Sequence, residues 1–185
     1  MRVISGSARG IKLDALEGLD TRPTTDRVKE AIFSMIQTQI IGANALDLFS
    51  GSGALGIELI SRGAKQVTFI ENNRHAMAVI EKNLLKTKTD SKARLLSSDV
   101  YKGIENLKNE VYNIIIMDPP YLKGEIKKCL SLIERFDLLD QEGMIIIEHA
   151  INDPNLDDLI EYFSLEKSKK YGKIGISILR RTTCA

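Results

Sequence analysis

The sequence predicts a doubly wound α/β domain built on a mostly parallel sheet. From residue 44 onward, short apolar runs alternate with amphipathic stretches of helical period, which is the order of repeated β-α units. Two runs, 114–117 and 144–147, contain only Ile and Met, as expected for parallel strands covered on both faces. The last two β-prone runs have no helix between them, so we expect the sheet to end in an antiparallel hairpin.

The elements before residue 44 form an N-terminal extension, residues 1–43. Two β-prone runs, 2–5 and 9–13, lie around Gly6 and Gly10 and suggest a short hairpin. A helix should follow, because apolar side chains then recur at helical spacing. Its N-cap candidates are Thr24, Thr25 and Asp26. Its apolar face consists of Val28, Ile32, Met35, Ile36 and Ile40.

The core, residues 44–185, should contain seven strands and the helices that connect them. The expected strands are 44–49, 66–71, 93–97, 111–117, 143–148, 163–168 and 174–180. The expected helices lie near 54–62, 73–86, 100–108, 124–134 and 155–162. Neither an internal repeat nor a linker-like stretch interrupts this pattern, so we expect one domain over residues 1–185.

Composition and charge limit the class of protein. With 43% hydrophobic and 28% charged residues the chain is of globular type, and no apolar run reaches the roughly 18 residues of a membrane span. The first residues lack the charged and then apolar pattern of a signal peptide. The two cysteines of the sequence, Cys129 and Cys184, are too few for a disulfide framework, and together with the two histidines they cannot form a zinc site. We expect a cytoplasmic monomer without a metal, in which His75 and His149 have ordinary packing or surface roles.

The net charge of +1 hides a regional sorting of charges. Residues 1–13 carry three basic side chains and no acid, and residues 165–185 carry six against one acid. An acidic stretch at 137–161 lies between them. Basic ends of this kind are either solvated surface or a contact for phosphate groups.

A glycine-rich turn follows the first strand of the core. Ligands of such sheets bind beyond the carboxyl ends of the strands, so the residues directly after each strand are the candidates for a site. Gly51, Gly53 and Gly56 form a GxGxxG pattern in which a ligand can approach backbone N–H groups at a helix start. Asp47, Ser50 and Ser52 lie in the same run, which favours a nucleotide-type ligand.

Acidic residues after the second and third strands strengthen that interpretation. Glu71 follows Gly51 by 20 positions, where a dinucleotide fold places the acid that accepts ribose hydroxyls, and Asn72 follows it. Asp99, with Ser98 beside it, could accept a hydrogen bond from an adenine amino group, although a helix N-cap explains Asp99 equally well.

The sequence Asp118, Pro119, Pro120, Tyr121 follows the fourth strand. Two consecutive prolines hold the backbone extended and remove two N–H donors, which leaves carbonyl groups without partners inside the loop. Asp118 and the Pro119 carbonyl can each accept one hydrogen of an exocyclic amine, and Tyr121 can stack on the base. This arrangement predicts a site that presents an amine nitrogen to an electrophile.

These residues together resemble the class I amino-methyltransferases with an (Asp/Asn)-Pro-Pro-(Tyr/Phe) signature, which use S-adenosylmethionine. Nearly the whole chain resembles one group of them, the RsmD family of bacterial 16S rRNA guanine-N2 methyltransferases. The matching segments are Arg22–Arg27 (RPTTDR), Asp47–Gly56 (DLFSGSGALG), Asp118–Tyr121 (DPPY), Glu148, Tyr171 and Gly172.

The resemblance implies a Rossmann-like sheet, an S-adenosylmethionine cofactor and a guanine of 16S rRNA as the substrate, with the small ribosomal subunit as the partner. The implied cofactor positions are Asp47, Ser50, Gly51, Gly53, Glu71 and Asp99. We expect the adjacent Ser52, Asn72 and Ser98 to belong to the same site. The implied amine positions are Asp118, Pro119, Pro120 and Tyr121. The residues expected to bind RNA are Arg2, Arg9, Lys12, Arg22, Arg27, Lys169, Lys170 and Lys173.

Three other functions share part of this pattern. A DNA or other RNA amino-methyltransferase could present adenine N6 or cytosine N4 with the same motif. A nicotinamide-dependent oxidoreductase shares the glycine loop and Glu71, but its fingerprint requires an apolar residue at the position of Asp47 and the chain has no evident catalytic Tyr/Lys pair. A non-catalytic RNA-binding domain of the same fold is the third alternative.

Overall fold

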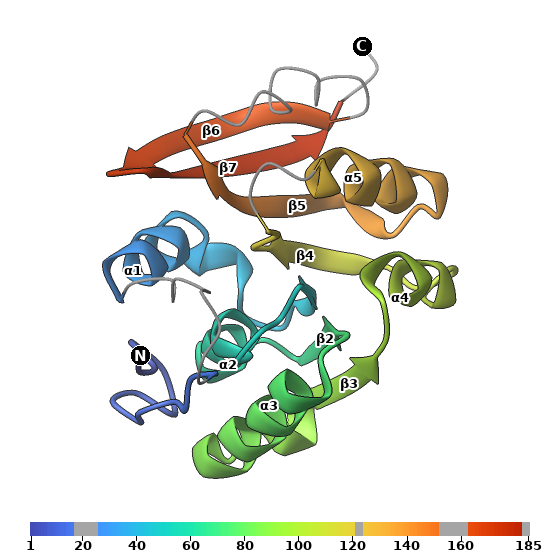
Figure 1. The fold of residues 1–185 in the computed structure, drawn as a ribbon. Coiled ribbons are helices and arrows are strands. Elements are labelled where there is room, and N and C mark those ends of the chain that lie inside the picture. Colours follow the sequence, from blue (N-terminus) through green and yellow to red (C-terminus); the bar gives the residue numbers. More distant parts are fainter. Residues whose placement is uncertain (17–25, 121–123, 152–162, 183–185) are drawn as a thin grey trace.

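A computed structural model describes residues 1–16, 26–120, 124–151 and 163–182 of the chain. Its sheet has seven strands in the order β3-β2-β1-β4-β5-β7-β6 (Figure 1). The strands are β1 Asn44–Leu48, β2 Gln66–Glu71, β3 Ala93–Ser97, β4 Tyr112–Met117, β5 Leu139–Ala150, β6 Phe163–Tyr171 and β7 Ile174–Arg181. Strands β1 to β5 are parallel, while β7 is antiparallel to both β5 and β6. The predicted fold class is therefore confirmed.

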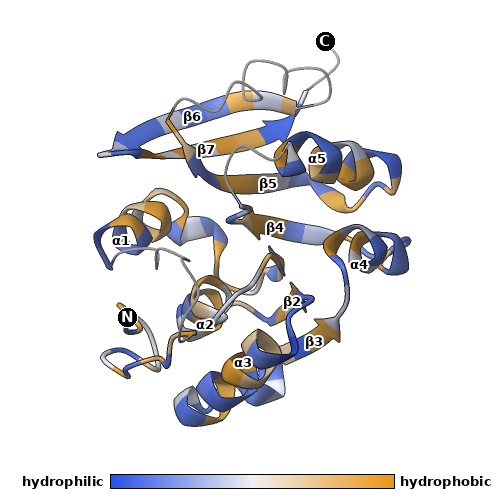
Figure 2. Cartoon of the chain, viewed as in Figure 1, coloured by the Kyte–Doolittle hydropathy of each residue, from blue (hydrophilic) through white to orange (hydrophobic). Residues whose placement is uncertain are grey.

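Helices cover both faces of this sheet and enclose two hydrophobic layers. The helices are α1 Asp26–Met35, α2 Ala54–Ser61, α3 Arg74–Thr87, α4 Val100–Asn106 and α5 Glu125–Arg135. The first three pack with the N-terminal residues on one face, and α4 and α5 pack on the other. Alternate residues of β4 serve the two layers, with Ile114 and Ile116 on one face and Ile115 and Met117 on the other. Figure 2 shows the apolar character of these central strands.

Most predicted boundaries agree with the structure to within two residues, and three differ. Strand β5 begins at Leu139 instead of 143. The sequence did not indicate this earlier start, because residues 140–142 are polar and lie outside the buried part of the strand. Helix α1 ends at Met35 and a 3₁₀ turn, Gln37–Gln39, follows, although Ile36 and Ile40 are buried as predicted. Strand β6 ends at Tyr171 instead of 168. The predicted N-terminal hairpin is present: Arg2 and Lys12 form an antiparallel bridge, and backbone hydrogen bonds join Val3 to Gly10 and Ile11. The helix predicted near 155–162 lies outside the described residues.

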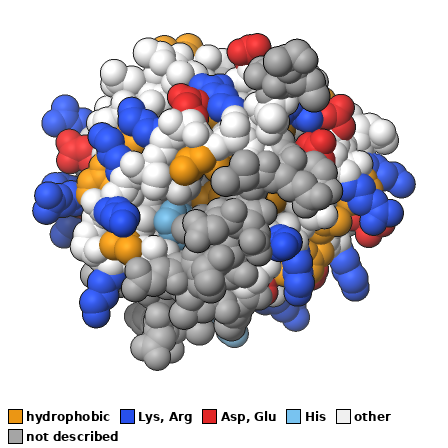
Figure 3. Space-filling view, turned by 90° about the horizontal axis from the view of Figure 1, so that it is seen from above, with side chains coloured by type: hydrophobic (Ala, Val, Ile, Leu, Met, Phe, Trp, Pro, Cys, Tyr) orange, Lys and Arg blue, Asp and Glu red, His pale blue; other side chains and the backbone are white. Residues whose placement is uncertain are grey.

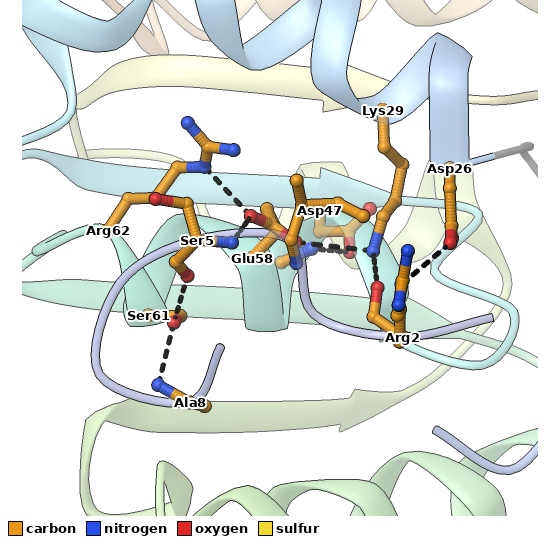
Figure 4. Close-up of polar contacts among 11 residues, drawn as sticks. Arg2, Ser5, Ala8, Asp26, Lys29, Asp47, Glu58, Ser61 and Arg62 are labelled. Atoms are coloured by element: carbon orange, nitrogen blue, oxygen red, sulfur yellow. Dashed lines mark hydrogen bonds and ion pairs between the residues drawn. The ribbon is translucent and has the colours of Figure 1, made fainter. Parts of the chain in front are cut away.

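A buried ion cluster fastens the N-terminal segment, residues 1–16, to α2 (Figure 4). Glu58, which is fully buried, pairs with Lys29 at 3.2 Å and with Arg62 at 2.8 Å. Its two oxygens also accept the backbone N–H groups of Ile4 and Ser5. Burial lowers the pKa of Lys29, and the charge of Glu58 opposes that shift. Because α2 also begins at the glycine-rich turn, the segment is fixed to the helix that carries the candidate site.

The tip of the same segment lies at the far end of α2. A side chain at Gly6, which has φ +85°, would overlap the backbone carbonyl of Ser61, so only glycine fits there. The Ser61 hydroxyl accepts the Ala8 N–H at 3.0 Å and donates to the Ser5 carbonyl at 2.5 Å. Ser61 is the last residue of α2. The tip is consequently about 12 Å along the helix from the glycine-rich turn.

Candidate active site

The glycine-rich turn connects β1 to α2 through three left-handed residues. Phe49, Gly51 and Gly53 have φ of 59°, 56° and 77°. The Ser50 hydroxyl lies inside the turn, 2.7 Å from the Asp47 carbonyl oxygen and 3.2 Å from the Ile70 carbonyl oxygen, and these two acceptors share its single hydrogen. A Cβ at Gly51 would meet only the Phe49 carbonyl, at 3.9 Å, so the space beside its backbone is open. The turn can therefore receive a ligand against its backbone, as the sequence predicts.

The third glycine of the pattern brings α2 against the sheet. A Cβ at Gly56 would overlap the Phe69 ring of β2. Close approach also lets the Gly56 N–H donate to Asp47 Oδ2 at 2.9 Å. Asp47 is only 1% exposed, and burial raises its pKa to about 7, with the nearby charge of Glu71 adding to the increase. The predicted cofactor residue Asp47 thus also joins β1 to the first turn of α2.

We expect Asp47→Asn to change how stability depends on pH. The pKa of this carboxyl is raised in the folded state from 3.8 to about 7, so the folded chain holds a proton that the unfolded chain has released. Its contribution is favourable at acid pH and is lost as the pH rises from about 4 to 7, at roughly 1.4 kcal/mol per pH unit. Urea unfolding between pH 4.5 and 7.5 should show the variant gaining on the wild type as pH rises. The exposed Asp90→Asn is the control, and a gap that does not change with pH contradicts the prediction.

Glu71 is held in place by two backbone groups at the end of β2. Its Oε2 accepts the Gly51 N–H at 2.9 Å, and its Oε1 accepts the Asn73 N–H at 2.9 Å. Each carboxylate oxygen can accept a second hydrogen bond, so the acid is oriented and can still accept hydrogen bonds from a ligand. Asn72 is exposed beside it, while Asn73 caps α3 by accepting the N–H groups of His75 and Ala76.

The residues after β3 combine a structural role with an exposed position. Asp99 is the N-cap of α4, and its Oδ1 accepts the Tyr101 N–H at 3.0 Å and the Lys102 N–H at 3.3 Å. The side chain is exposed, and Ser98 is half-buried. The N-cap interpretation is therefore correct for Asp99, and a role toward an adenine group remains a prediction.

The Asp-Pro-Pro motif leaves the sheet next to the glycine-rich turn. Strands β1 and β4 are neighbours, and Leu48 pairs with Met117, so Phe49 and Asp118 follow directly at adjacent strand ends. Asp118 is half-buried, Pro119 is buried and Pro120 is exposed. Tyr121 lies outside the described residues. The structure thus brings together the predicted cofactor turn and the predicted amine motif.

Only some of the predicted RNA-binding residues lie at this edge of the sheet. Lys169, Lys170 and Lys173 are exposed around the β6–β7 turn, and pairing of Ala150 with Ile174 places that turn beside the carboxyl end of β5. Figure 3 shows Lys and Arg side chains on both sides of the view, including the left, the side where Figure 1 places this turn.

The predicted RNA-binding residues of the N-terminal part are more scattered. Arg9 is exposed near the tip of the N-terminal segment, at the far end of α2. Arg2 pairs with Asp26 at 3.1 Å, and Lys12 and Arg27 are exposed. Arg22 lies outside the described residues. Arg9 is therefore separated from the β6–β7 turn.

Two polar contacts near the site were not anticipated from the sequence. Asn83 of α3 is fully buried and contacts the Ser52 carbonyl of the glycine-rich turn. Tyr101 donates its hydroxyl to Glu125, which joins the first turn of α4 to the first turn of α5. An Asn on the buried face of a helix was the available signal for the first contact, whereas the second depends on how two helices pack.

The described part of the chain lacks two further features. No helix there has the length and apolar character needed to cross a membrane. No group of three or more His, Cys, Asp and Glu side chains in those residues could hold a metal ion.

Known proteins are similar to this chain in sequence and in fold. The model of one family, described as Conserved hypothetical protein 95, matches residues 1–180. Ribosomal RNA small subunit methyltransferase D of Escherichia coli is 34% identical over 98% of this chain and 90% of its own length. The YlbH protein of Bacillus subtilis, described as an rRNA methyltransferase, is 36% identical over 98% and 99%. The solved structure of yhhF from Escherichia coli, described as a methyltransferase, has a TM-score of 0.87 and 34% identity, covering 100% of this chain and 99% of that one.

The strand order, the glycine-rich turn beside Glu71 and the adjacent Asp-Pro-Pro motif define a class I, S-adenosylmethionine-dependent methyltransferase. Within that class, the similar sequences indicate one family. This chain belongs to the RsmD family of methyltransferases, which confirms the resemblance identified from its motifs.

Proposed function

We propose that this chain transfers a methyl group from S-adenosylmethionine to the exocyclic N2 amine of a specific guanine in 16S rRNA, within the assembled small ribosomal subunit. The observation that carries this proposal is the register of β1 and β4, which sets the glycine-rich turn and the Asp-Pro-Pro motif side by side. The names of the relatives from Escherichia coli and Bacillus subtilis support an rRNA substrate. We further propose a monomer that works in the cytoplasm as one domain, with residues 1–43 assisting RNA binding.

The residues at the cofactor positions suit S-adenosylmethionine. The open space at Gly51 accommodates a ligand against the backbone, and the oriented carboxylate of Glu71 can accept ribose hydroxyls. Ser50, Ser52 and Gly53 complete the turn. The exposed Asn72 and Asp99 and the half-buried Ser98 follow the neighbouring strands β2 and β3. When bound, the cofactor supplies an electrophilic methyl group on a sulfonium sulfur. No metal is proposed to take part.

The chain's own contribution to the reaction is to position the amine. Asp118 and the Pro119 carbonyl each accept one hydrogen of the NH2 group, which turns the nitrogen lone pair away from them. Pro120 keeps the loop extended, and Tyr121 stacks on the guanine. Most of the acceleration then comes from alignment, and a strong base is not required because the amine proton leaves with or after the attack.

A methylation assay with three substrates tests the proposal. Naked 16S rRNA, purified small subunits and duplex DNA are incubated with methyl-labelled cofactor, and the modified nucleosides are mapped by mass. We expect N2-methylguanine at one site, formed fastest in the subunit. Transfer to adenine in DNA without any transfer to guanine in RNA would favour the DNA amino-methyltransferase instead, and binding of NADH without S-adenosylmethionine would favour an oxidoreductase.

Replacing Lys169, Lys170 and Lys173 together by Gln should flatten the salt dependence of RNA binding. Each phosphate contact contributes roughly 0.7 to 0.9 to the slope of log K against log salt, so the triple change should lower that slope by up to about 2 to 3. Binding is measured between 50 and about 200 mM salt. The control replaces Lys65, Lys88 and Lys92, which are exposed near the opposite edge of the sheet. Equal slopes for the two triple variants would contradict a phosphate contact at the β6–β7 turn.

A further inference from the structure

Asn83 connects two segments that are far apart in the sequence. Its Nδ2 donates to the Ser52 carbonyl at 2.9 Å and to the Asp14 carbonyl at 3.0 Å. Its Oδ1 accepts the Asp14 N–H at 2.8 Å. The side chain is 0% exposed. One buried amide therefore joins the glycine-rich turn to the end of the N-terminal segment.

The neighbouring contacts on α3 reinforce only the Asp14 side of this connection. Lys82 and Lys86 pair with the Asp14 carboxylate at 2.7 Å and 3.0 Å. These lysines are partly to largely exposed, and ion pairs at exposed positions contribute little. The buried amide contacts backbone groups, and losing a buried hydrogen-bond partner is costly. A displacement of the glycine-rich turn would therefore reach the N-terminal segment through the hydrogen bonds of Asn83.

The glycine-rich turn depends on side chains from outside it for support. Glu71 holds the Gly51 N–H from β2, and Asn83 holds the Ser52 carbonyl from α3. Ser52 lies between Gly51 and Gly53, which both have left-handed backbone angles. Glycine is the residue with the greatest backbone freedom, so this part of the turn is the least fixed by its own sequence. Ile80 of α3 packs beside Gly53, so without the amide the turn would lose the hydrogen bond from α3 while keeping this apolar contact.

We propose that Asn83 is a positioning residue for the cofactor turn, and that through it docking of the N-terminal segment raises the affinity for S-adenosylmethionine. Asn83 acts on the cofactor through the Ser52 backbone. Coupling of two binding events is reciprocal, so bound cofactor must also stabilise the Asp14 end of the segment. This inference rests on the proposed binding of the cofactor at the turn.

The test compares Asn83→Asp and Asn83→Ser with the wild type. Aspartate keeps the size and the acceptor but loses both Nδ2 donors, and serine is too short to bridge the two segments. We expect the dissociation constant for S-adenosylmethionine, measured by calorimetry at 20 °C, to rise tenfold or more. The single-turnover rate at saturating cofactor should stay within threefold, because the amine motif follows a different strand. Asp14→Ala is the matched control, since it removes the ion pairs but keeps the backbone contacts, and should change affinity less than twofold.

A purely structural role for Asn83 predicts a different result. If both Asn83 variants unfold at a lower temperature but bind the cofactor as the wild type does, the inference is wrong. If neither variant folds, hydrogen exchange of the wild type decides, because bound cofactor must slow exchange at the Asp14 amide, and unchanged exchange there overturns the proposal. Binding to the wild type is measured first, so that failure of the proposed function is recognised separately.

Discussion

Asp118→Ala should lower the single-turnover rate on the order of 100-fold or more while leaving cofactor affinity within a few fold. The expected size is that of losing one preorganised hydrogen-bonding group in other enzymes. The two effects separate because Asp118 follows β4, whereas the cofactor turn follows β1 and is held by Glu71. Rapid-quench assays with labelled cofactor give the rate, and calorimetry gives the affinity.

Two further variants make this result specific. Asp118→Asn keeps an oxygen that can accept from the amine, so it should retain more activity than Asp118→Ala. The exposed Asp90→Ala removes a carboxylate that lies before the amino end of β3, not at the carboxyl ends of the strands, and this variant should behave as the wild type does. Wild-type rates in Asp118→Ala would show that the Asp-Pro-Pro motif is not the amine site.

The central strands were predictable because a strand buried on both faces has apolar residues at consecutive positions. Ile114–Met117 and Met144–Ile147 are apolar without interruption and lie between two helical layers. The first residues of β5 carry no such signal, because residues 140–142 extend past the core. Helix α1 was predicted too long, since Ile36 and Ile40 continue the apolar spacing through a 3₁₀ turn. Periodicity therefore reports which residues are buried more reliably than where a helix ends.

The candidate site was predictable to the extent that its residues follow strands. The spacing of Glu71 and Gly51 assigned both residues to one cofactor site, and the structure places them together, with Glu71 Oε2 accepting the Gly51 N–H at 2.9 Å. This hydrogen bond itself was not predicted. The supports of the site could not be found in this way. Glu58 meets Ile4 and Ser5 from more than 50 positions away, and Asn83 meets Asp14 from 69. A single polar residue on the buried face of a helix indicates that a contact exists, but it does not identify a partner so distant in the sequence.

Glu71→Ala should weaken binding of S-adenosylmethionine by roughly 1.5 to 3 kcal/mol, the range for hydrogen bonds to a charged group. This corresponds to a dissociation constant about 10-fold to 150-fold higher. Two losses combine here, since the ribose hydroxyls lose an acceptor and the Gly51 N–H loses the carboxylate that orients the turn. We therefore expect a value toward the upper end of the range.

Glu71→Gln distinguishes these two losses. Glutamine has one oxygen where the acid has two, so it can accept either the Gly51 N–H or the Asn73 N–H but not both. The variant should weaken binding less than alanine does, while the exposed Glu81→Ala on α3 should leave it unchanged. Because Glu71 ends β2 and the amine motif follows β4, with β1 between them, the single-turnover rate at saturating cofactor should change little. Wild-type affinity in Glu71→Ala would remove the ribose contact from the site and leave Glu71 as a support of the turn alone.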